Sequence, residues 1–321
     1  MKTLKIGNVE LENRYILAPM AGVSDLPFRL LCKEQGAGLV CMEMVSAKAI
    51  YYNNKNTDQL MEIHPEEGPV SLQLFGSDPK IMGEMAKRIE ERPFSILDVN
   101  MGCPVPKVVN NHEGSALMKN PKLVEEIVTS LVKAIEKPVT VKIRKGFDEN
   151  NVNAVEIAKI AEACGAAAVA VHGRTREQYY SGKADWEIIA RVKDAVKIPV
   201  IGNGDVTDIE SAQKLMEQTK CDGVMVGRAV RGNPFLFREL VHFEQTGQRC
   251  AKATPQEVKE AILKHAALQI EYKGEYTAVR EMRKHISWYS AGYPGSTRLR
   301  AKINEMENMD DILAIVEKIF V

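Results

Sequence analysis

The segment VIGNGDVTDIESAQKLMEQTKCDGVMVGR, residues 200–228, contains the unit that decides the fold. It runs from a short apolar stretch through a glycine-rich loop and a helical stretch to a second apolar stretch and a second glycine. Short apolar stretches without polar alternation are typical of parallel strands buried on both faces. The segment therefore predicts a strand, a covering helix and the next parallel strand of an α/β protein.

The same pattern repeats from residue 15 to about residue 240. Predicted strands cover residues 15–19, 39–43, 70–75, 96–100, 139–144, 167–172, 200–202 and 223–226. Predicted helices cover residues 27–35, 79–91, 121–135, 152–164, 186–196 and 208–218. Eight strand–helix units in roughly 225 residues match the size of a (β/α)8 TIM barrel. The alternative, a doubly wound open sheet, is disfavoured because no GxGxxG motif follows the first strand.

The pattern changes after about residue 241. Three amphipathic helices are predicted over residues 254–272, 276–289 and 309–320, with no strands between them. We therefore expect a barrel over residues 1–241 and a small all-α helical bundle over residues 242–321. Residues 245–303 hold eleven Lys and Arg against five Asp and Glu. This basic region suits a phosphate-backbone partner, although a solvated helix face would look the same.

Composition sets the broad class of the protein. The 321 residues are 45% hydrophobic, and Lys plus Arg equal Asp plus Glu at 43 each. The N-terminus lacks an apolar signal segment, and no apolar stretch reaches the roughly 18 residues of a membrane span. The six cysteines show no metal-binding spacing. We expect a protein of the reducing cytoplasm with no membrane association and no metal.

Polar or reactive residues follow nearly every predicted strand, where (β/α)8 barrels place their catalytic groups. The loops GNGD (202–205) and GRA (227–229) follow the last two strands. Glycine lets backbone N–H groups approach a phosphate, and arginine adds a charged fork. These two loops form the usual phosphate site of such barrels. We therefore expect FMN or another phosphorylated ligand, the alternative being glycines that serve only tight turns.

Two further polar residues interrupt apolar strands. Lys142 lies within the run PVTVKIR (138–144), in the interior of the barrel or at its mouth. A charge there needs a partner, which we expect to be either the negative edge of a reduced flavin or a carboxylate such as Glu43. His172 ends the sixth strand and is expected to bind phosphate or substrate, although a lone histidine is more often structural.

Cys103 lies in the loop after the predicted strand 96–100, between Gly102 and Pro104. A thiol with an ordinary pKa of about 8.5 is mostly protonated at neutral pH, so it can donate a proton. A nucleophilic role would need a base that lowers this pKa, and the sequence shows no obvious Cys–His pair. We therefore favour proton donation.

The motifs taken together resemble the tRNA-dihydrouridine synthase family, and most of all its bacterial B-type members. They are APMAGVSD (18–25), VNMGCPVPKV (99–108), GSALM (114–118), VKIRKG (141–146), VHGRTR (171–176), IGNGDV (201–206) and VGRAVRGNP (226–234). In addition, KHISWY (284–289) is similar to a segment of the family's helical RNA-binding domain. The resemblance covers nearly the whole chain.

This resemblance implies an FMN-containing barrel with a tRNA-binding helical domain, expected to be a monomer. NADPH would reduce FMN, hydride would pass to C6 of a uridine, and Cys103 would protonate C5. The FMN-binding residues would be Pro19, Met20, Ala21, Gln73, Asn100, Lys142, His172, Asn203, Gly204, Asp205, Gly227 and Arg228. The tRNA-binding residues would be Arg144, Arg174, Arg176, Arg280, Arg283, Lys284, His285 and Trp288.

Other functions compete with this one. An FMN barrel that reduces a free pyrimidine would use a similar loop cysteine but would have no purpose for the basic helices. A ribosomal RNA target and flavin-assisted methyl transfer keep the flavin but change the substrate or the chemistry. A non-enzymatic RNA-binding protein would not need the reactive residues at the strand ends.

Overall fold

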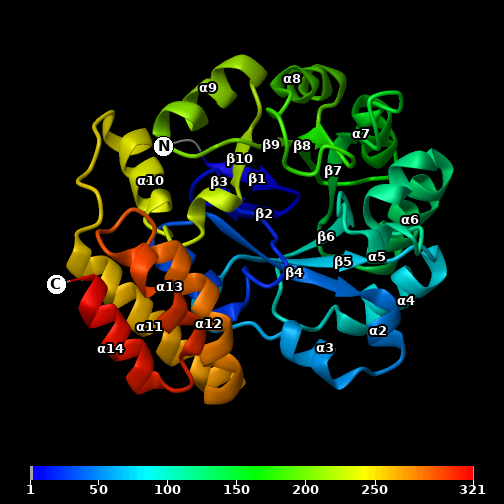
Figure 1. Cartoon of the computed structure of the whole chain (residues 1–321). Coiled ribbons are helices and arrows are strands. Elements are labelled where there is room, and N and C mark those ends of the chain that lie inside the picture. The colour runs from blue at the N-terminus through cyan, green and yellow to red at the C-terminus, as the bar shows by residue number, and fades with distance from the viewer. Residues whose placement is uncertain (1–2, 321) are drawn as a thin grey trace.

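The computed structural model describes residues 3–320 and confirms the predicted barrel. Within this range eight parallel strands close in the order β10-β3-β4-β5-β6-β7-β8-β9, with helices around them (Figure 1). The strands are β3 (Tyr15–Leu17), β4 (Leu39–Ser46), β5 (Val70–Phe75), β6 (Ile96–Met101), β7 (Val139–Gly146), β8 (Ala168–Thr175), β9 (Val200–Asn203) and β10 (Gly223–Val226).

Side chains alternate between the inside of the barrel and the layer that faces the helices, as the pleat of a strand requires. On β7, Val139, Val141 and Ile143 belong to the core shared with the helices. Thr140 instead lines a small cavity inside the barrel. Because Lys142 lies two residues further along β7, it shares the inward face of Thr140.

A β-hairpin that the sequence patterns did not predict closes one end of the barrel. It consists of β1 (Leu4–Ile6) and β2 (Val9–Leu11), which pair antiparallel. Leu4, Ile6 and Leu11 are buried in one cluster with the interior residue Ile16. A Cβ on Gly223, the first residue of β10, would lie 2.9 Å from Leu4. The hairpin therefore covers the amino ends of the strands and leaves their carboxyl ends free for a site.

The predicted helices around the barrel are confirmed within two residues at each end. They are α1 (Leu26–Glu34), α4 (Pro79–Ile89), α6 (Pro121–Ala134), α7 (Ala154–Ala163), α8 (Trp186–Ala195) and α9 (Ile209–Thr219). Side chains of Asp25, Asp78 and Asn120 accept backbone N–H groups at the first turns of α1, α4 and α6. Shorter elements in the loops were not predicted: α2 (Ala47–Tyr51), α3 (Lys55–Leu60), α5 (Pro106–Val109), and the 3-10 turns η1 (Pro65–Glu67), η2 (Gly114–Lys119) and η3 (Arg228–Val230).

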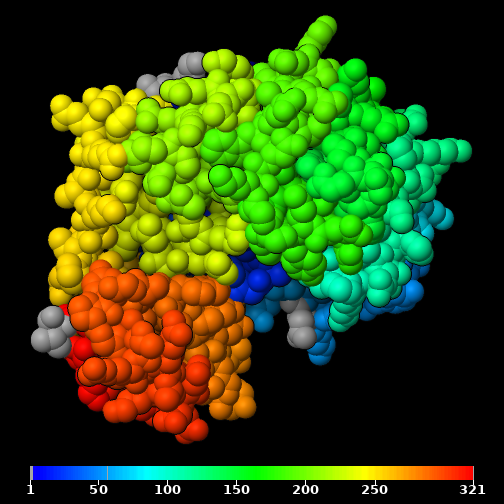
Figure 2. Space-filling model, turned by 45° about the horizontal axis from the view of Figure 1, so that its top comes forward, coloured from blue at the N-terminus to red at the C-terminus, as the bar shows by residue number. Residues whose placement is uncertain are grey.

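The C-terminal helices form a second hydrophobic cluster and a lobe at one side of the barrel (Figure 2). They are α11 (Pro255–Lys273), α12 (Glu275–Tyr289), α13 (Ser296–Glu305) and α14 (Met309–Ile319). Sequence patterns missed α13. No helix in residues 3–320 is long and apolar enough to cross a membrane.

The predicted domain boundary at residue 241 is wrong. It falls inside α10 (Leu236–Thr246), whose Leu236, Phe237 and Leu240 are buried in the core of the barrel. The chain leaves the barrel after this helix, in the segment that leads to α11. The apolar face of α10 therefore assigns it to the barrel and not to the helical domain.

The helical domain is attached to the barrel through Asp25 at the start of α1. Its Oδ2 accepts hydrogen bonds from Gln269 Nε2 at 2.5 Å and Lys273 Nζ at 2.6 Å. Burial alone would raise the pKa of Asp25, but Lys273 and the nearby histidines outweigh it and lower the pKa to about 2. The carboxylate thus stays charged and joins the two domains with charge-assisted hydrogen bonds.

A second buried ion pair fixes a loop to α1. The Arg29 guanidinium donates from Nε to Glu67 Oε2 at 2.7 Å and to the carbonyls of Ser24 and Glu62. Both charged side chains are almost fully buried, at 2% and 0% exposure. Every oxygen or nitrogen left unpaired at such a site would carry a large desolvation cost.

We expect Glu67→Ala to lower the free energy of unfolding by about 3–5 kcal/mol, because it leaves the Arg29 charge buried without its partner. Urea denaturation followed by circular dichroism measures the change. Lys80→Ala is the matched control, since it breaks the exposed pair with Glu84 and should cost no more than about 0.5 kcal/mol. Equal losses in the two variants would contradict this account of the buried pair.

Candidate active site

Lys142 lies on the inward face of β7, at the carboxyl end of the barrel. Its Nζ donates to Asn203 Oδ1 at 3.2 Å, and Asn203 Nδ2 in turn donates to the carbonyl of Met225. In the described part of the chain Lys142 forms no ion pair with a carboxylate. The alternative partner Glu43 accepts instead from the backbone N–H of Gly22. The lysine is therefore free to hold a negative or electron-rich group.

The surroundings of Lys142 change its charge state. Burial, followed by the positive charge of Arg144, lowers the pKa of Lys142 to about 8. The ammonium group is retained at neutral pH but lies close to its titration range. An anion placed beside Nζ would remove much of this penalty, because an opposite charge favours the protonated form.

His172 ends the regular part of β8 next to this lysine. The side chain is buried, at 8% exposure. Burial, and then the charges of Lys142 and Arg144, lower the pKa of His172 well below its ordinary value. The imidazole is therefore neutral at physiological pH, with one nitrogen as a donor and the other as an acceptor. It can form hydrogen bonds to a ligand without adding charge.

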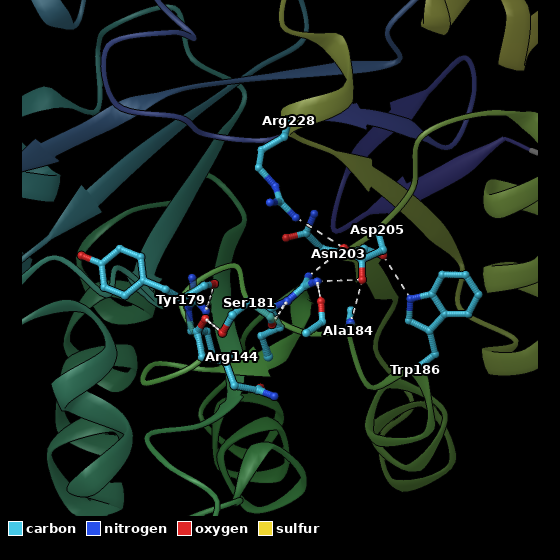
Figure 3. Close-up of polar contacts among 12 residues, drawn as sticks. Arg144, Tyr179, Ser181, Ala184, Trp186, Asn203, Asp205 and Arg228 are labelled. Atoms are coloured by element: carbon cyan, nitrogen blue, oxygen red, sulfur yellow. Dashed lines mark hydrogen bonds and ion pairs between the residues drawn. The ribbon is translucent and has the colours of Figure 1, made fainter.

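The loop after β9 is organised by Asp205 (Figure 3). Its carboxylate binds Arg174 Nη1 at 2.8 Å, Arg228 Nη2 at 3.4 Å and the backbone N–H of Ala184 at 2.7 Å. A carboxylate would repel a phosphate, so this geometry does not support the expected direct contact of Asp205 with the cofactor. Asp205 instead fixes Arg228, whose side chain remains 42% exposed and can reach an anion.

Gly204 in this loop is required both by its backbone conformation and by the close approach of neighbouring atoms. Gly204 has φ +124°, and a Cβ there would lie 2.7 Å from Ala184 and 3.1 Å from the ring of His172. The Gly204 carbonyl also accepts from the Trp186 indole at 3.0 Å. Asn203 ends β9 and Gly227 directly follows β10, so both residues lie at the same two loops expected to bind phosphate. Bare backbone beside an exposed arginine is the chemistry that a phosphate needs, so the residues fit the phosphate of FMN.

The other residues expected to bind cofactor lie around the same mouth. Pro19 and Met20 are partly buried and Ala21 is exposed, all in the loop after β3. The Met20 carbonyl accepts from Val23 and Ser24 in a tight turn. Gln73 and Asn100 are almost fully buried and bonded to each other at 2.7 Å. The barrel therefore brings every residue of the predicted FMN set to one end.

Cys103 lies in the loop after β6 and is partly exposed. Its backbone N–H donates to Asn100 Oδ1 at 2.8 Å. Burial raises the pKa of the thiol, and this outweighs the opposing effects of a backbone hydrogen bond and of the positive charges of Arg144 and Lys142. The thiol is therefore protonated at neutral pH. This state suits a proton donor and does not suit a nucleophile.

Two of the arginines expected to contact RNA are buried structural groups. Arg144 is 3% exposed and donates to the carbonyls of Gly102, Thr175 and Tyr179 at 2.8–2.9 Å. Arg174 is 2% exposed, forms an ion pair with Asp205 and donates to two loop carbonyls. The assignment of Arg174 as a direct RNA contact is wrong for this conformation, and Arg144 serves to hold the Cys103 loop. Arg176 is partly buried, 5.4 Å from the Phe147 ring.

The residues of the KHISWY segment also divide between the surface and the core. Lys284 Nζ would lie 3.4 Å from a Cβ on Gly22, so it reaches the mouth of the barrel. His285 of α12 is fully buried against Phe28 of α1 and His265 of α11, which makes its assignment as an RNA contact wrong. Trp288 lies under Arg231, with the guanidinium carbon 4.9 Å from the ring centroid.

Two other expected contacts are already engaged within the helical domain. Arg283 donates to the Met306 carbonyl, and Arg280 stacks on Tyr276 at 3.5 Å. Arg283 thus connects α12 to the end of α13, whereas Arg280 and the exposed Tyr276 remain at the surface.

Sequence reasoning missed several residues of the site. Tyr180, 48% exposed, lies over the mouth with its ring 4.6 Å from the Arg228 guanidinium and 6.4 Å from the His172 ring. Its position after VHGRTR, in a loop rich in tyrosine, was the available signal. Asp98 and Thr140 form a buried bonded pair below the mouth. In the described residues no group of three or more His, Cys, Asp or Glu could hold a metal.

The fold, the phosphate-type loops, the interior lysine and the protonated loop thiol define an oxidoreductase of the (β/α)8 barrel class. Comparison with known proteins gives the family. The chain belongs to the dihydrouridine synthase family, whose model, described as dihydrouridine synthase (Dus), matches residues 16–321. The membership expected from the motifs is thus confirmed.

Relatives match over the full length of the chain. It is 45% identical to the tRNA-dihydrouridine synthase B of Pseudomonas aeruginosa over 100% of this chain and 96% of that protein. It is 44% identical to a probable tRNA-dihydrouridine synthase of Rickettsia bellii over 98% of this chain and 96% of that protein.

Solved structures share the fold at low sequence identity. Histamine dehydrogenase from Rhizobium sp. 4-9 superposes with a TM-score of 0.56 and 14% identity, over 83% of this chain and 50% of that one. An old yellow enzyme homologue from Zymomonas mobilis gives a TM-score of 0.52 and 13% identity, over 80% and 95%.

We expect the stability of the flavin-free protein to rise relative to that of Lys142→Met between pH 8 and pH 10. The pKa of Lys142 falls from 10.5 to about 8 on folding, so the unfolded chain binds more protons in this window and the free energy of unfolding increases with pH. Below about pH 8 both states are protonated, and the cost of burying the charge is present in full. Urea denaturation of both proteins at several pH values tests this. Parallel stability curves would contradict the assigned environment of Lys142.

Proposed function

We propose that this protein is a tRNA-dihydrouridine synthase that uses FMN and NADPH to reduce the C5=C6 bond of specific uridines. One observation carries the proposal. A protonated Cys103 and a cationic Lys142 face the same barrel mouth, which also carries phosphate-type loops. Reduction of a uracil needs a hydride at C6, a proton at C5 and a site for the cofactor, and this mouth combines all three requirements.

When bound, FMN would supply the hydride for C6 of uracil. Arg228 and the backbone around Gly204 and Gly227 would hold its phosphate, with Asp205 fixing the arginine. Lys142 would stabilise negative charge on the cofactor, and the neutral His172 would add hydrogen bonds without charge. Pro19, Met20 and Ala21 line the mouth, while Gln73 and Asn100 close the floor of the site.

Cys103 supplies the proton. The C4 carbonyl polarises the C5=C6 bond, so hydride adds at C6 and C5 becomes the basic position that must be protonated. The raised pKa of the Cys103 thiol keeps that proton available at neutral pH. The hydrogen bond from the Cys103 backbone N–H to Asn100 holds the loop in position. General acid catalysis of this kind contributes roughly 10²–10⁴-fold to a rate.

A folded tRNA is the substrate that the rest of the chain suits. The target base must leave its stack to reach the mouth, and a second, basic domain can grip the surrounding backbone. Arg298, Arg300 and Lys302 lie exposed on α13, and Lys284 connects this domain to the mouth. A free pyrimidine would need none of these residues. We further propose that the protein works in the cytoplasm as a monomer.

We expect Cys103→Ala to reduce dihydrouridine formation in an unmodified tRNA transcript by roughly 10²-fold or more, because it removes the proposed proton donor to C5. FMN content and tRNA affinity should be retained. Mass spectrometry of digested tRNA measures the product after incubation with FMN and NADPH. Cys164→Ala is the matched control, a partly exposed cysteine at the end of α7. Normal turnover of Cys103→Ala would eliminate the proton-donor role.

We expect Arg298→Ala combined with Arg300→Ala to weaken tRNA binding, because two exposed cations are removed from α13. The slope of log K against log salt should become shallower by about 0.7–0.9 for each RNA phosphate that the variant no longer neutralises. Filter binding at several salt concentrations provides the measurement, with Lys80→Ala on α4 as the control for an exposed cation. An unchanged slope would place the RNA on another surface.

A further inference from the structure

A chain of hydrogen bonds runs from the interior of the barrel to the loop that carries Cys103. Asp98 Oδ2 accepts from Gln73 Nε2 at 2.7 Å. Gln73 Oε1 accepts from Asn100 Nδ2 at 2.7 Å. Asn100 Oδ1 then accepts the backbone N–H groups of Gly102 at 3.1 Å and Cys103 at 2.8 Å.

The direction of every bond in this chain is set by its first member. Both oxygens of Asp98 accept, one from the Thr140 hydroxyl and the other from Gln73, so Gln73 turns its amide nitrogen towards Asp98. This orientation presents the Gln73 oxygen to Asn100, so Asn100 donates from its amide nitrogen. The Asn100 oxygen is thereby left for the two N–H groups of the loop. Reversing any one amide would place two acceptors or two donors face to face.

Strand register keeps the chain together. Gln73 on β5 lies opposite Asp98 on β6, and Asp98 lies opposite Thr140 on β7. Thr140 Oγ1 donates to the second oxygen of Asp98 at 2.6 Å. Gln73, Asp98, Thr140 and Asn100 are all buried, at 8% exposure or less. Water therefore competes little for these bonds, and buried polar groups depend on one another for their partners.

We propose that Asp98 is a positioning residue that, through Gln73 and Asn100, orients the loop carrying Cys103 for proton transfer. The inference rests on the proposed function in that Cys103 is the proton donor. Asp98 touches neither the thiol nor the mouth. Its effect passes through the orientation of two amides to two backbone N–H groups, which fix the position of the Cys103 loop.

A charge effect on Lys142 is the competing explanation for any loss caused by removing Asp98, since the two groups interact electrostatically. Two substitutions separate the explanations. Asp98→Asn removes the charge but keeps an oxygen that can accept from Gln73, with its nitrogen turned to the Thr140 hydroxyl. Asp98→Leu removes the acceptor as well, at a side chain that borders a small cavity together with Cys41 and Thr140.

The experiment measures the rate at which iodoacetamide alkylates Cys103 in the purified protein, by peptide mass spectrometry. Cys164 serves as the internal reference, because it is also partly exposed. We expect Asp98→Leu to speed alkylation of Cys103 at least about threefold as the loop is released, and Asp98→Asn to stay within about twofold of the wild type. Reoxidation of the reduced protein by tRNA should slow roughly 10- to 100-fold in Asp98→Leu, with reduction by NADPH unchanged.

Equal alkylation rates in Asp98→Leu and the wild type would overturn the proposal, and so would equal effects of the Leu and Asn variants, which would indicate charge. If Asp98→Leu does not fold, Gln73→Met decides, because it removes the bonds of Gln73 to both Asp98 and Asn100 and keeps the carboxylate. Faster alkylation of Cys103 in that variant supports the relay, and a wild-type rate rejects it. The thiol assay needs no RNA. Absence of dihydrouridine formation by the wild-type protein would therefore reject the proposed function separately.

Discussion

The pairing of β10 with β3 is the constraint on which the site depends, because it turns a row of strands into a ring. Val224 lies opposite Tyr15 and Val226 opposite Leu17. Closure brings the loop after β10, with Arg228, next to the loop after β3, with Met20. It also forces alternate residues of each strand into a confined interior, where a polar side chain must find a partner or attract one. Lys142, bonded to Asn203, shows the consequence.

Confinement also explains the electrostatics of the mouth. Burial lowers the pKa of Lys142 and of His172 and raises that of Cys103. The three shifts share their largest cause, removal from water, which disfavours the charged form of each group. They leave an ammonium group with a lowered pKa, a neutral imidazole and a protonated thiol at the same mouth. Such a combination can bind an anionic cofactor while keeping a proton for the substrate.

Much of this arrangement could be predicted from the sequence. Apolar stretches alternating with helical stretches indicated the order of the elements, and polar residues at the strand ends indicated the site, since both signals are local. Interactions between distant segments could not be predicted in this way. Asp98 reads as one polar residue within a buried strand, and its partners Gln73 and Thr140 become visible only when three strands are placed in register.

The errors have the same origin. The family resemblance implies RNA contacts for His285 and Arg174, yet both are buried because neighbouring elements cover them. Tertiary packing also places α10 on the barrel, where the change in sequence pattern suggested a domain boundary. Asp25 is a further example. The sequence shows it only as a helix cap, whereas in the structure it also accepts hydrogen bonds from Gln269 and Lys273 of the helical domain.

Reduction of uridine within folded tRNA can be observed in the cell. The measurement is position-by-position mapping of dihydrouridine in tRNA, from cells with and without an intact gene for this chain. We expect dihydrouridine to disappear from one or more defined tRNA positions without the gene, and to return with the wild-type protein but not with Cys103→Ala. An unchanged dihydrouridine map would show that this protein does not reduce uridine in tRNA, whatever flavin the purified protein binds.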